Sequence, residues 1–270
     1  MALTHPDKHR YLDVPAAGDR PRGTLVLLHA FPLNARMWEP QLALASHGWR
    51  VIAPHLRGFD GGVDEADASS VDDYAGDVID LLDSLHIKDA VIGGLSMGGY
   101  VAFALLRRAP SYVRGLILAD TRSQADTPEG VENRKKMLKQ LTDAGDRGPS
   151  VLIEDMLPKL LGAATLANQP AVVARIRSLA LSNPPAAIAG GIRALMTRPD
   201  STPLLRTVHC PTMIVVGADD ALTPPSFSEE MHQAIAGSEL VIVPGAGHLS
   251  SLEQPAAFNS ALAAFLTHRV

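Results

Sequence analysis

The chain has 270 residues, 46% of them hydrophobic and 20% charged, which excludes a disordered protein and allows one large domain or two small ones. The single cysteine, Cys210, cannot form an internal disulfide, which excludes the disulfide-stabilised secreted class. A net charge of −5 and the absence of a long apolar run give no reason to expect nucleic acid or membrane as partners. The polar N-terminus lacks a signal peptide's apolar stretch, so we expect a cytoplasmic protein.

Short apolar runs alternate with helical patterns along most of the chain. Most of these runs are rich in Val, Ile and Leu without polar alternation, which is typical of parallel strands buried on both faces. Helical patterns such as Val71–His86 lie between them, so we predict an α/β fold with a mostly parallel, doubly wound sheet. The expected strands are Thr24–His29, Arg50–Ala53, Ala90–Gly94, Gly115–Ala119, Thr212–Gly217 and Leu240–Pro244, with His9–Val14 as a candidate antiparallel edge strand.

The alternation stops after Ala119, and residues 121–201 have helical patterns throughout. This stretch is too long for one crossover helix, so we expect a helical insertion packed over one end of the sheet. It contains no aromatic residue, and its basic run Arg134–Lys136 with Lys139 is interpreted as the solvated face of a helix. The expected helices are Pro128–Ala144, Ser150–Leu161, Pro170–Leu181 and Pro185–Thr197, and Glu253–His268 forms a final helix after the last strand.

Ser96 is the candidate nucleophile. It stands in the segment Gly94–Gly98, of the form G-x-S-x-G, between the expected strand Ala90–Gly94 and a helical pattern over Met97–Arg108. A serine at so sharp a strand-to-helix turn is strained and projects its hydroxyl outward, and the flanking glycines leave room that a Cβ would fill. The alternative is a glycine-rich corner without chemistry.

A serine nucleophile needs a base, and the base needs an acid that orients it. His248 follows the last strand in the segment Gly245–His248, on the loop edge that also carries Ser96. Gly245 and Gly247 let this loop place the imidazole freely, although an ordinary surface histidine is the alternative. The acid belongs at the end of another strand, and chain order alone leaves three candidates open: Asp120, Asp219 and Asp220.

The loop after Thr24–His29 is the candidate source of an oxyanion hole. There the backbone N–H of Phe31 pairs with that of Met97, unless this segment is only a turn into the next helix. Trp38 follows and forms either a wall of the pocket or part of the core. No metal-ligand pattern such as H-E-x-x-H occurs, so we expect no metal and no cofactor.

Four segments, LLHAFPLNARMW, GGLSMGGYVAF, VVGADDALTPP and GAGHLSSLEQP, stand in an order that resembles the serine α/β-hydrolase superfamily, in its esterase and 3-oxoadipate enol-lactonase-like branch. The resemblance covers nearly the whole chain. It implies a core of residues 1–120 and 202–270 and a helical cap of residues 121–201, inserted after the sixth strand. It also implies a triad of Ser96, His248 and Asp220, the aspartate three residues after the glycine and four before the proline.

Two departures from the family pattern stand near the expected site. Ala30 replaces the glycine of many members, which costs about 1 kcal/mol if its φ is positive. The usual D-x-R-G-x-G-x-S stretch appears as His55–Gly62, which leaves His55 and Asp60 without an assigned role.

The resemblance implies a hydrolase that cleaves a small-molecule carboxylic ester or lactone through an acyl-enzyme. The oligomeric state is left open between a monomer and a homodimer. The alternatives are a 3-oxoadipate enol-lactonase or other C–O or C–C bond hydrolase, a slow-turnover or non-catalytic ligand receptor on the same fold, and a purely structural domain. The aliphatic insertion predicts an apolar pocket of modest size. Candidates for holding a substrate carboxylate are Arg122, Arg193 and Arg198.

Overall fold

The computed structural model describes residues 10–19, 21–59 and 70–270, and its centre is a single sheet. The strand order is β1-β3-β2-β4-β5-β6-β7, with β1 antiparallel to β3 and every other pair parallel. The strands are β1 (Tyr11–Val14), β2 (Gly23–Leu28), β3 (Trp49–Pro54), β4 (Ala90–Leu95), β5 (Val113–Ala119), β6 (Thr212–Gly217) and β7 (Glu239–Val243). The predicted mostly parallel sheet and its antiparallel edge strand are confirmed, although His9 lies outside the described residues.

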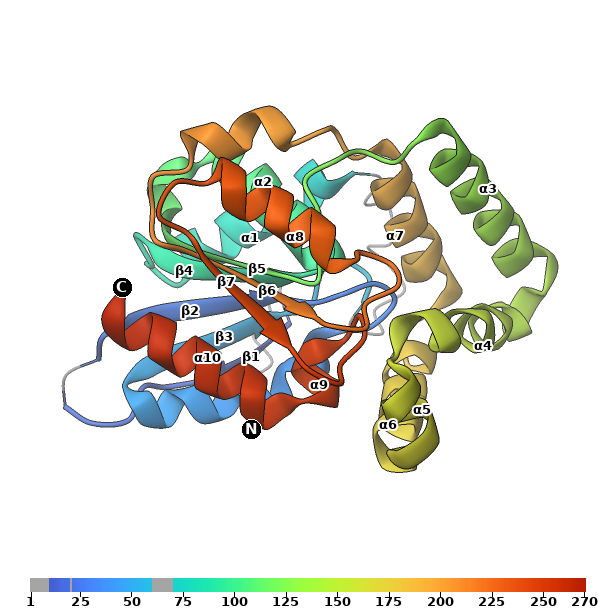
Figure 1. The fold of residues 1–270 in the computed structure, drawn as a ribbon. Coiled ribbons are helices and arrows are strands. Elements are labelled where there is room, and N and C mark those ends of the chain that lie inside the picture. The colour runs from blue at the N-terminus through green and yellow to red at the C-terminus, as the bar shows by residue number, and fades with distance from the viewer. Residues whose placement is uncertain (1–9, 20, 60–69) are drawn as a thin grey trace.

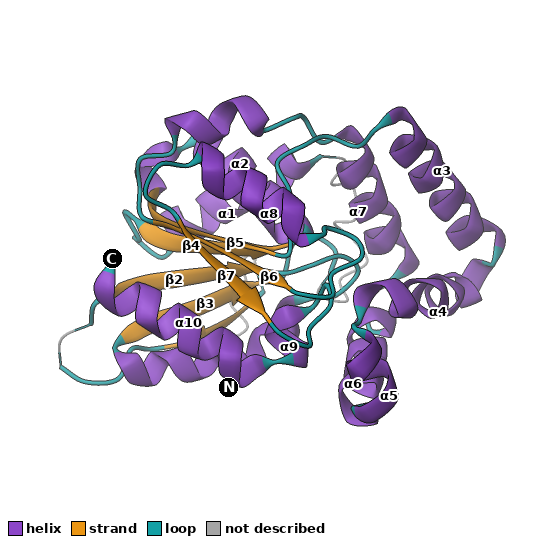
Figure 2. Ribbon diagram, viewed as in Figure 1, coloured by secondary structure: helices purple, strands orange, loops and turns teal. Residues whose placement is uncertain are grey.

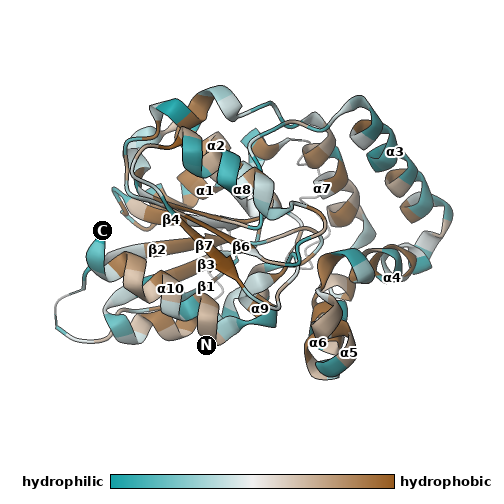
Figure 3. Ribbon diagram, viewed as in Figure 1, coloured by the Kyte–Doolittle hydropathy of each residue, from teal (hydrophilic) through white to brown (hydrophobic). Residues whose placement is uncertain are grey.

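Helices cover both faces of the sheet (Figures 1 and 2). One face carries α1 (Val71–Ser84), α2 (Met97–Arg108) and α8 (Pro225–Ala234), and the other carries the 3₁₀ helix η1 (Ala35–His47) and α10 (Pro255–His268). This doubly wound arrangement buries every residue of β4 and β6, which explains why their sequences show no polar alternation (Figure 3). Within the described ranges, no helix is long and apolar enough to cross a membrane.

Five α-helices lie between β5 and β6, beyond the end of the sheet where the loops follow the strands (Figure 1). We call them the cap helices: α3 (Pro128–Asp143), α4 (Gly148–Leu160), α5 (Ala163–Asn168), α6 (Pro170–Leu181) and α7 (Pro185–Thr197). The short α5 was not predicted, and the predicted final helix is divided into α9 (Ser250–Glu253) and α10. The sequence predicted that the insertion follows a sixth strand, whereas among the described residues it follows β5, the fifth. The reason is that described residues ahead of β2 form one strand only, β1.

The two ends of the insertion are joined to each other. The N–H of Ser201 donates to the carbonyl of Ser123 at 2.8 Å. Arg198 and Asp126 form an ion pair at 2.7 Å whose side chains are only 2% and 3% exposed. The Arg198 guanidinium also lies 4.2 Å from the ring centroid of Tyr100 on α2. These contacts hold the cap helices against the core at the edge where the strands end.

Candidate active site

The residues singled out in the sequence come together at the carboxyl ends of neighbouring strands. Ser96 follows β4, Asp120 follows β5, Asp220 follows β6 and His248 follows β7. The hydrogen-bond ladder of the sheet continues past the strand ends. The N–H of Ser96 donates to the carbonyl of Ala119, and the N–H of Asp120 donates to the carbonyl of Val215, both at 2.9 Å. In an open parallel sheet this edge is where ligands bind.

Ser96 occupies a strained backbone conformation, with φ 54° and ψ −112°. Both flanking positions require glycine, because other backbone atoms lie where a Cβ would stand. A Cβ on Gly94 would lie 2.1 Å from the carbonyl oxygen of Gly98, and a Cβ on Gly98 would lie 2.1 Å from that of Leu28. The predicted strained turn is confirmed, and it presents Oγ of Ser96 at the N-terminus of α2.

His248 joins Ser96 to Asp220. Its Nε2 lies 2.8 Å from Oγ of Ser96, and its Nδ1 lies 2.8 Å from Oδ2 of Asp220. Oδ1 of Asp220 accepts from the N–H groups of Leu222 and Thr223 at 2.9 Å, and Thr223 Oγ1 donates to Oδ2 at 2.7 Å. Burial raises the pKa of Asp220, but the charge and hydrogen bond of His248 and the hydrogen bonds of Thr223 together outweigh it, so the pKa lies below its ordinary value. An ionised Asp220 places the proton on Nδ1 and leaves Nε2 free to accept one from Ser96.

The other two acid candidates are placed differently. The side chain of Asp219 is exposed, and its backbone N–H donates to the carbonyl of Ala246. Asp120 is buried, with its Oδ1 accepting from the N–H of Gly217 at 2.8 Å and its Oδ2 accepting from Oγ of Ser250 at 2.5 Å. The carboxylate that contacts His248 therefore belongs to Asp220, which the family pattern had favoured.

The loop that carries His248 is held by the cap helices. The N–H of His248 donates to the carbonyl of Leu160 at 3.1 Å. The buried carboxylate of Glu253 accepts from the N–H groups of Gly162 and Gly247 at 2.8 and 2.9 Å. Gly245 has a positive φ of 66°, which fits its predicted role of giving this loop conformational freedom. The same interpretation of Gly247 is wrong, because Gly247 is not among the described glycines with positive φ. A Cβ there would lie 2.4 Å from the backbone nitrogen of Gly162, so Gly247 serves close packing.

A buried neutral histidine orients the peptide before Phe31. His29 donates from Nδ1 to the carbonyl of Ala30 at 3.1 Å, and its Nε2 accepts from the N–H of Leu56 at 3.0 Å. Burial lowers the pKa of His29 to about 3, so the ring is uncharged at neutral pH. Because a trans peptide directs its N–H opposite to its C=O, the N–H of Phe31 faces away from His29.

The two N–H groups proposed for an oxyanion hole have no competing acceptor in the described part of the chain. The N–H of Phe31 makes no hydrogen bond there. Met97 is the first residue of α2, so its N–H has no partner inside the helix. Ala30 is not among the described non-glycine residues with positive φ, which are His86, Ser96 and Asp120, so its replacement of glycine carries no backbone strain.

A cavity of about 270 Å³ opens beside Ser96 and His248. Trp38 does not line it, because its indole is 1% exposed and packs 6.1 Å from the ring of Phe258, so the interpretation as a pocket wall is wrong. His55 bonds through Nδ1 to the carbonyl of Phe59 at 3.0 Å, and Asp60 lies outside the described residues. The lining residues are Phe31, Ser96, Tyr100, Arg122, Asp126, Gly130, Asn133, Arg134, Met137, Met156, Lys159, Leu160, Leu195, Leu222, Thr223 and His248.

The charged part of this lining differs from the sequence prediction. Arg122 lines the cavity as predicted, but Arg193 does not, and Arg198 is buried in its ion pair with Asp126. Arg134, interpreted as solvated, faces the cavity, and Lys159 was not singled out at all. The pocket is thus only partly apolar.

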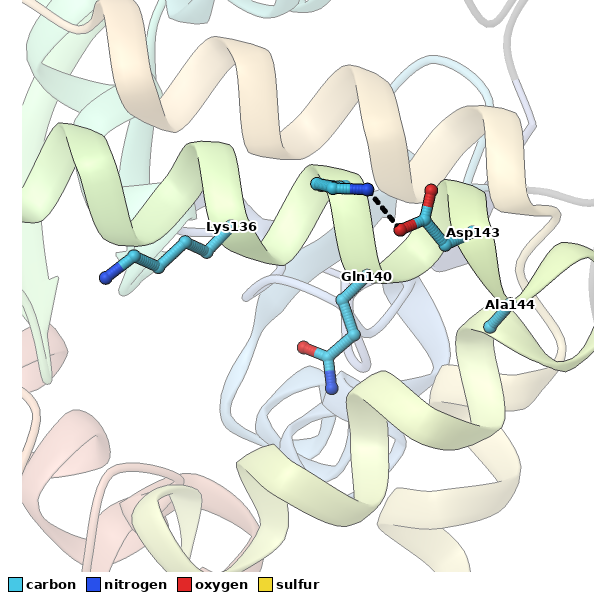
Figure 4. Close-up of a pocket in the computed structure, with 5 residues that line it drawn as sticks. Lys136, Gln140, Asp143 and Ala144 are labelled. Atoms are coloured by element: carbon cyan, nitrogen blue, oxygen red, sulfur yellow. Dashed lines mark hydrogen bonds and ion pairs between the residues drawn. The ribbon is translucent and has the colours of Figure 1, made fainter.

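Helical spacing explains the position of Arg134. Positions 130, 133, 134 and 137 of α3 share the face that lines the cavity. Lys136, Gln140 and Asp143 lie on another part of α3, where Asp143 pairs with Lys139 (Figure 4). The spacing was readable in the sequence, but nothing in it indicated that this face meets the cavity.

Asp120 makes the free energy of unfolding depend on pH. Burial raises the pKa of its carboxyl well above the ordinary 3.8, and the charge of Asp220 adds to the rise. The folded protein therefore retains a proton on Asp120 that the unfolded chain releases. The contribution of this carboxyl to the free energy of unfolding is fully present below pH 3.8 and is lost as pH rises through the pKa of the folded state.

We expect Asp120→Asn to remove this dependence, because the amide can still accept from Gly217 and donate to Ser250 without a charge. Urea unfolding between about pH 4 and pH 8 should show Asp120→Asn gaining stability relative to the wild type as pH rises. Asp120→Ala, which loses both contacts, should be destabilised by about 1–3 kcal/mol in acid as well. A difference between Asp120→Asn and the wild type that stays constant with pH would contradict the prediction.

Known hydrolases resemble this chain in sequence and in fold. The family model described as "Alpha/beta hydrolase family" matches residues 25–261. A thermophilic esterase from Thermogutta terrifontis is similar in structure, with a TM-score of 0.87 and 36% identity over 98% of this chain and 96% of that one. The enol-lactonase of Burkholderia xenovorans has a TM-score of 0.84 and 28% identity over 96% of this chain and 97% of that one. 3-Oxoadipate enol-lactonase 2 of Acinetobacter baylyi is 24% identical over 94% of this chain and 92% of its own length.

Proposed function

This chain belongs to the alpha/beta hydrolase family, and from that premise we propose that it is a serine hydrolase that cleaves a carboxylic ester or lactone through an acyl-enzyme. One observation carries the proposal: Oγ of Ser96, the imidazole of His248 and the carboxylate of Asp220 form an unbroken hydrogen-bonded chain, and Ser96 and His248 line a cavity. The similarity to an esterase and to enol-lactonases supports the choice of substrate bond.

Acylation begins with the transfer of the Ser96 hydroxyl proton to Nε2 of His248 while Oγ attacks the carbonyl carbon. The N–H groups of Phe31 and Met97 hold the oxyanion of the tetrahedral intermediate. Each such donor contributes roughly 10²–10³ in rate. The intermediate then collapses, the C–O bond to the alcohol breaks, and the leaving oxygen takes the proton from Nε2.

Deacylation repeats these steps with water. His248 takes a proton from a water molecule that attacks the acyl carbon, and the acid leaves as Oγ of Ser96 recovers its proton. Asp220 does not take a proton in either half. It holds the ring in the tautomer with Nδ1 protonated and stabilises the imidazolium that forms.

A lactone is the second candidate substrate, because two of the similar proteins are enol-lactonases. The chemistry at Ser96 is the same, but the leaving oxygen stays tethered to the acyl group. The residues around the reacting bond therefore do not distinguish an ester substrate from a lactone substrate. Measured rates of hydrolysis on the two classes of compound do.

The test is steady-state hydrolysis of 4-nitrophenyl acetate, butyrate and octanoate, together with labelling by diethyl 4-nitrophenyl phosphate. We expect turnover of at least one ester and one diethylphosphoryl group per chain on the peptide that holds Ser96, located by mass spectrometry. Labelling without ester turnover would favour the lactone, to be followed on an enol-lactone. One product per chain without further turnover would favour the receptor, and the absence of both label and turnover would overturn the proposal.

A further inference from the structure

The cavity beside Ser96 carries an excess of positive charge. Its lining contains three basic side chains, Arg122, Arg134 and Lys159, and one acid, Asp126. Arg122 lies between β5 and α3, Arg134 on α3, and Lys159 near the end of α4, so three segments of the insertion direct cations toward one space. No composition effect accounts for this, because the whole chain has a net charge of −5.

Asp126 does not neutralise this group, because its carboxylate is shared among three arginines. Oδ1 accepts from Arg122 and from the buried Arg198, each at 2.7 Å, and Oδ2 accepts from Nε of Arg134 at 3.2 Å. Burial raises the pKa of Asp126, but the arginines outweigh it and keep the carboxyl ionised. One negative charge therefore faces three guanidinium groups.

Two cationic groups are left to bind something else. Arg134 uses only Nε on Asp126, and its terminal nitrogens have no partner among residues 10–19, 21–59 and 70–270. The exposed Lys159 makes no hydrogen bond or ion pair within those same ranges. A guanidinium and an ammonium around one cavity match the charge and the hydrogen-bonding capacity of a carboxylate.

We propose that Arg134 and Lys159, supported by Arg122, form a subsite for a free carboxylate of the substrate. This inference rests on the proposed function and deepens it: the substrate is an ester or lactone that keeps an ionised carboxylate away from the bond cleaved at Ser96. A neutral substrate of the same size would cover these cations without pairing them, which costs free energy on binding.

The test compares esters matched in carbon number. The anionic series is the 4-nitrophenyl monoesters of succinic, glutaric, adipic and suberic acid, and the neutral series is the butyrate, pentanoate, hexanoate and octanoate. The enzyme-free rate is subtracted, because a nearby carboxylate accelerates the uncatalysed reaction. A carboxylate on the leaving alcohol is tested with 3-carboxyphenyl acetate against phenyl acetate.

We expect kcat/KM for the anionic member of at least one pair to exceed that for the neutral member, and the ratio to fall as salt is added. Lys159→Met should lower this ratio by about tenfold, and Lys159→Met with Arg134→Met by up to about 100-fold. The matched control is Lys136→Met, which removes the same charge from a lysine of α3 that does not line this cavity. It should leave the ratio within about twofold.

A ratio of anionic to neutral kcat/KM that Lys159→Met leaves unchanged, or that Lys136→Met lowers equally, would overturn the subsite. An equal fall in kcat/KM for both esters would indicate only a structural effect of the substitution and would also count against the subsite. Binding of adipate, measured by calorimetry on the wild type and on Lys159→Met, decides the subsite without turnover. Failure of the proposed function would give a different result. There would be no ester turnover and no label on Ser96, while adipate would still bind the wild type more tightly than Lys159→Met.

Discussion

Ser96→Ala is expected to lower kcat for ester hydrolysis by roughly 10⁴–10⁶-fold. The change removes the proposed nucleophile, Oγ of Ser96, which lies 2.8 Å from Nε2 of His248. The backbone N–H groups of Phe31 and Met97 remain, so the residual rate reports what they and binding contribute. Steady-state kinetics on the best 4-nitrophenyl ester, with the loss of phosphoryl labelling as a second readout, check the expectation.

The same substitution should leave the free energy of unfolding nearly unchanged. Alanine and serine bear the same strain at φ 54°, and the lost side-chain contact is the single hydrogen bond to His248. A thermal unfolding midpoint equal to or slightly above that of the wild type would therefore show that the loss of turnover is chemical. Turnover at the wild-type rate in Ser96→Ala would exclude Ser96 as the nucleophile.

Asp220→Asn is expected to lower kcat by about 10⁴-fold while the protein stays folded. Oδ1 of Asp220 accepts two backbone N–H groups, so in the variant the amide oxygen takes this position and the NH₂ group faces His248. The NH₂ group is a hydrogen-bond donor, so Nδ1 of His248 must lose its proton and accept a hydrogen bond from it. The proton moves to Nε2, and His248 can no longer accept the proton of Ser96.

Asp219→Asn is the matched control, because it makes the same chemical change at the adjacent, exposed carboxylate. It should alter kcat by less than about twofold, and both variants should unfold at temperatures close to that of the wild type. A loss of similar size in the two variants would mean that the effect comes from the loop as a whole and not from the hydrogen bond between Asp220 and His248.

The sheet and the turn at Ser96 were predictable because they depend on neighbours in the sequence. Strands buried on both faces, such as β4 and β6, need continuous apolar runs. The apolar runs in the sequence match β2 to β7 to within about two residues at their ends. The strained turn needs glycine on both sides of Ser96, since a Cβ at either position would overlap backbone atoms. His248 follows from its place after the last strand, because all parallel strands end at one edge.

The acid was not determined by the residues alone, which left Asp120, Asp219 and Asp220 open. All three follow strands of the same sheet, so strand order cannot separate them. Their difference is one of direction: Asp220 faces His248, Asp120 is directed into the core toward Ser250, and Asp219 is exposed. The family pattern favoured the one that the fold directs toward His248.

The sequence by itself determined the sheet, the turn at Ser96 and the two loops that hold Phe31 and His248, because turn sterics and strand burial act over a few consecutive residues. Only the tertiary structure decided that Arg134 and Lys159 face the cavity and that Trp38 does not. A helix can have more than one polar face, and the face that lies next to Ser96 depends on how segments distant in the sequence pack together. The charge selectivity that we propose for this site therefore depends on how the cap helices pack, although each of the residues involved is visible in the sequence.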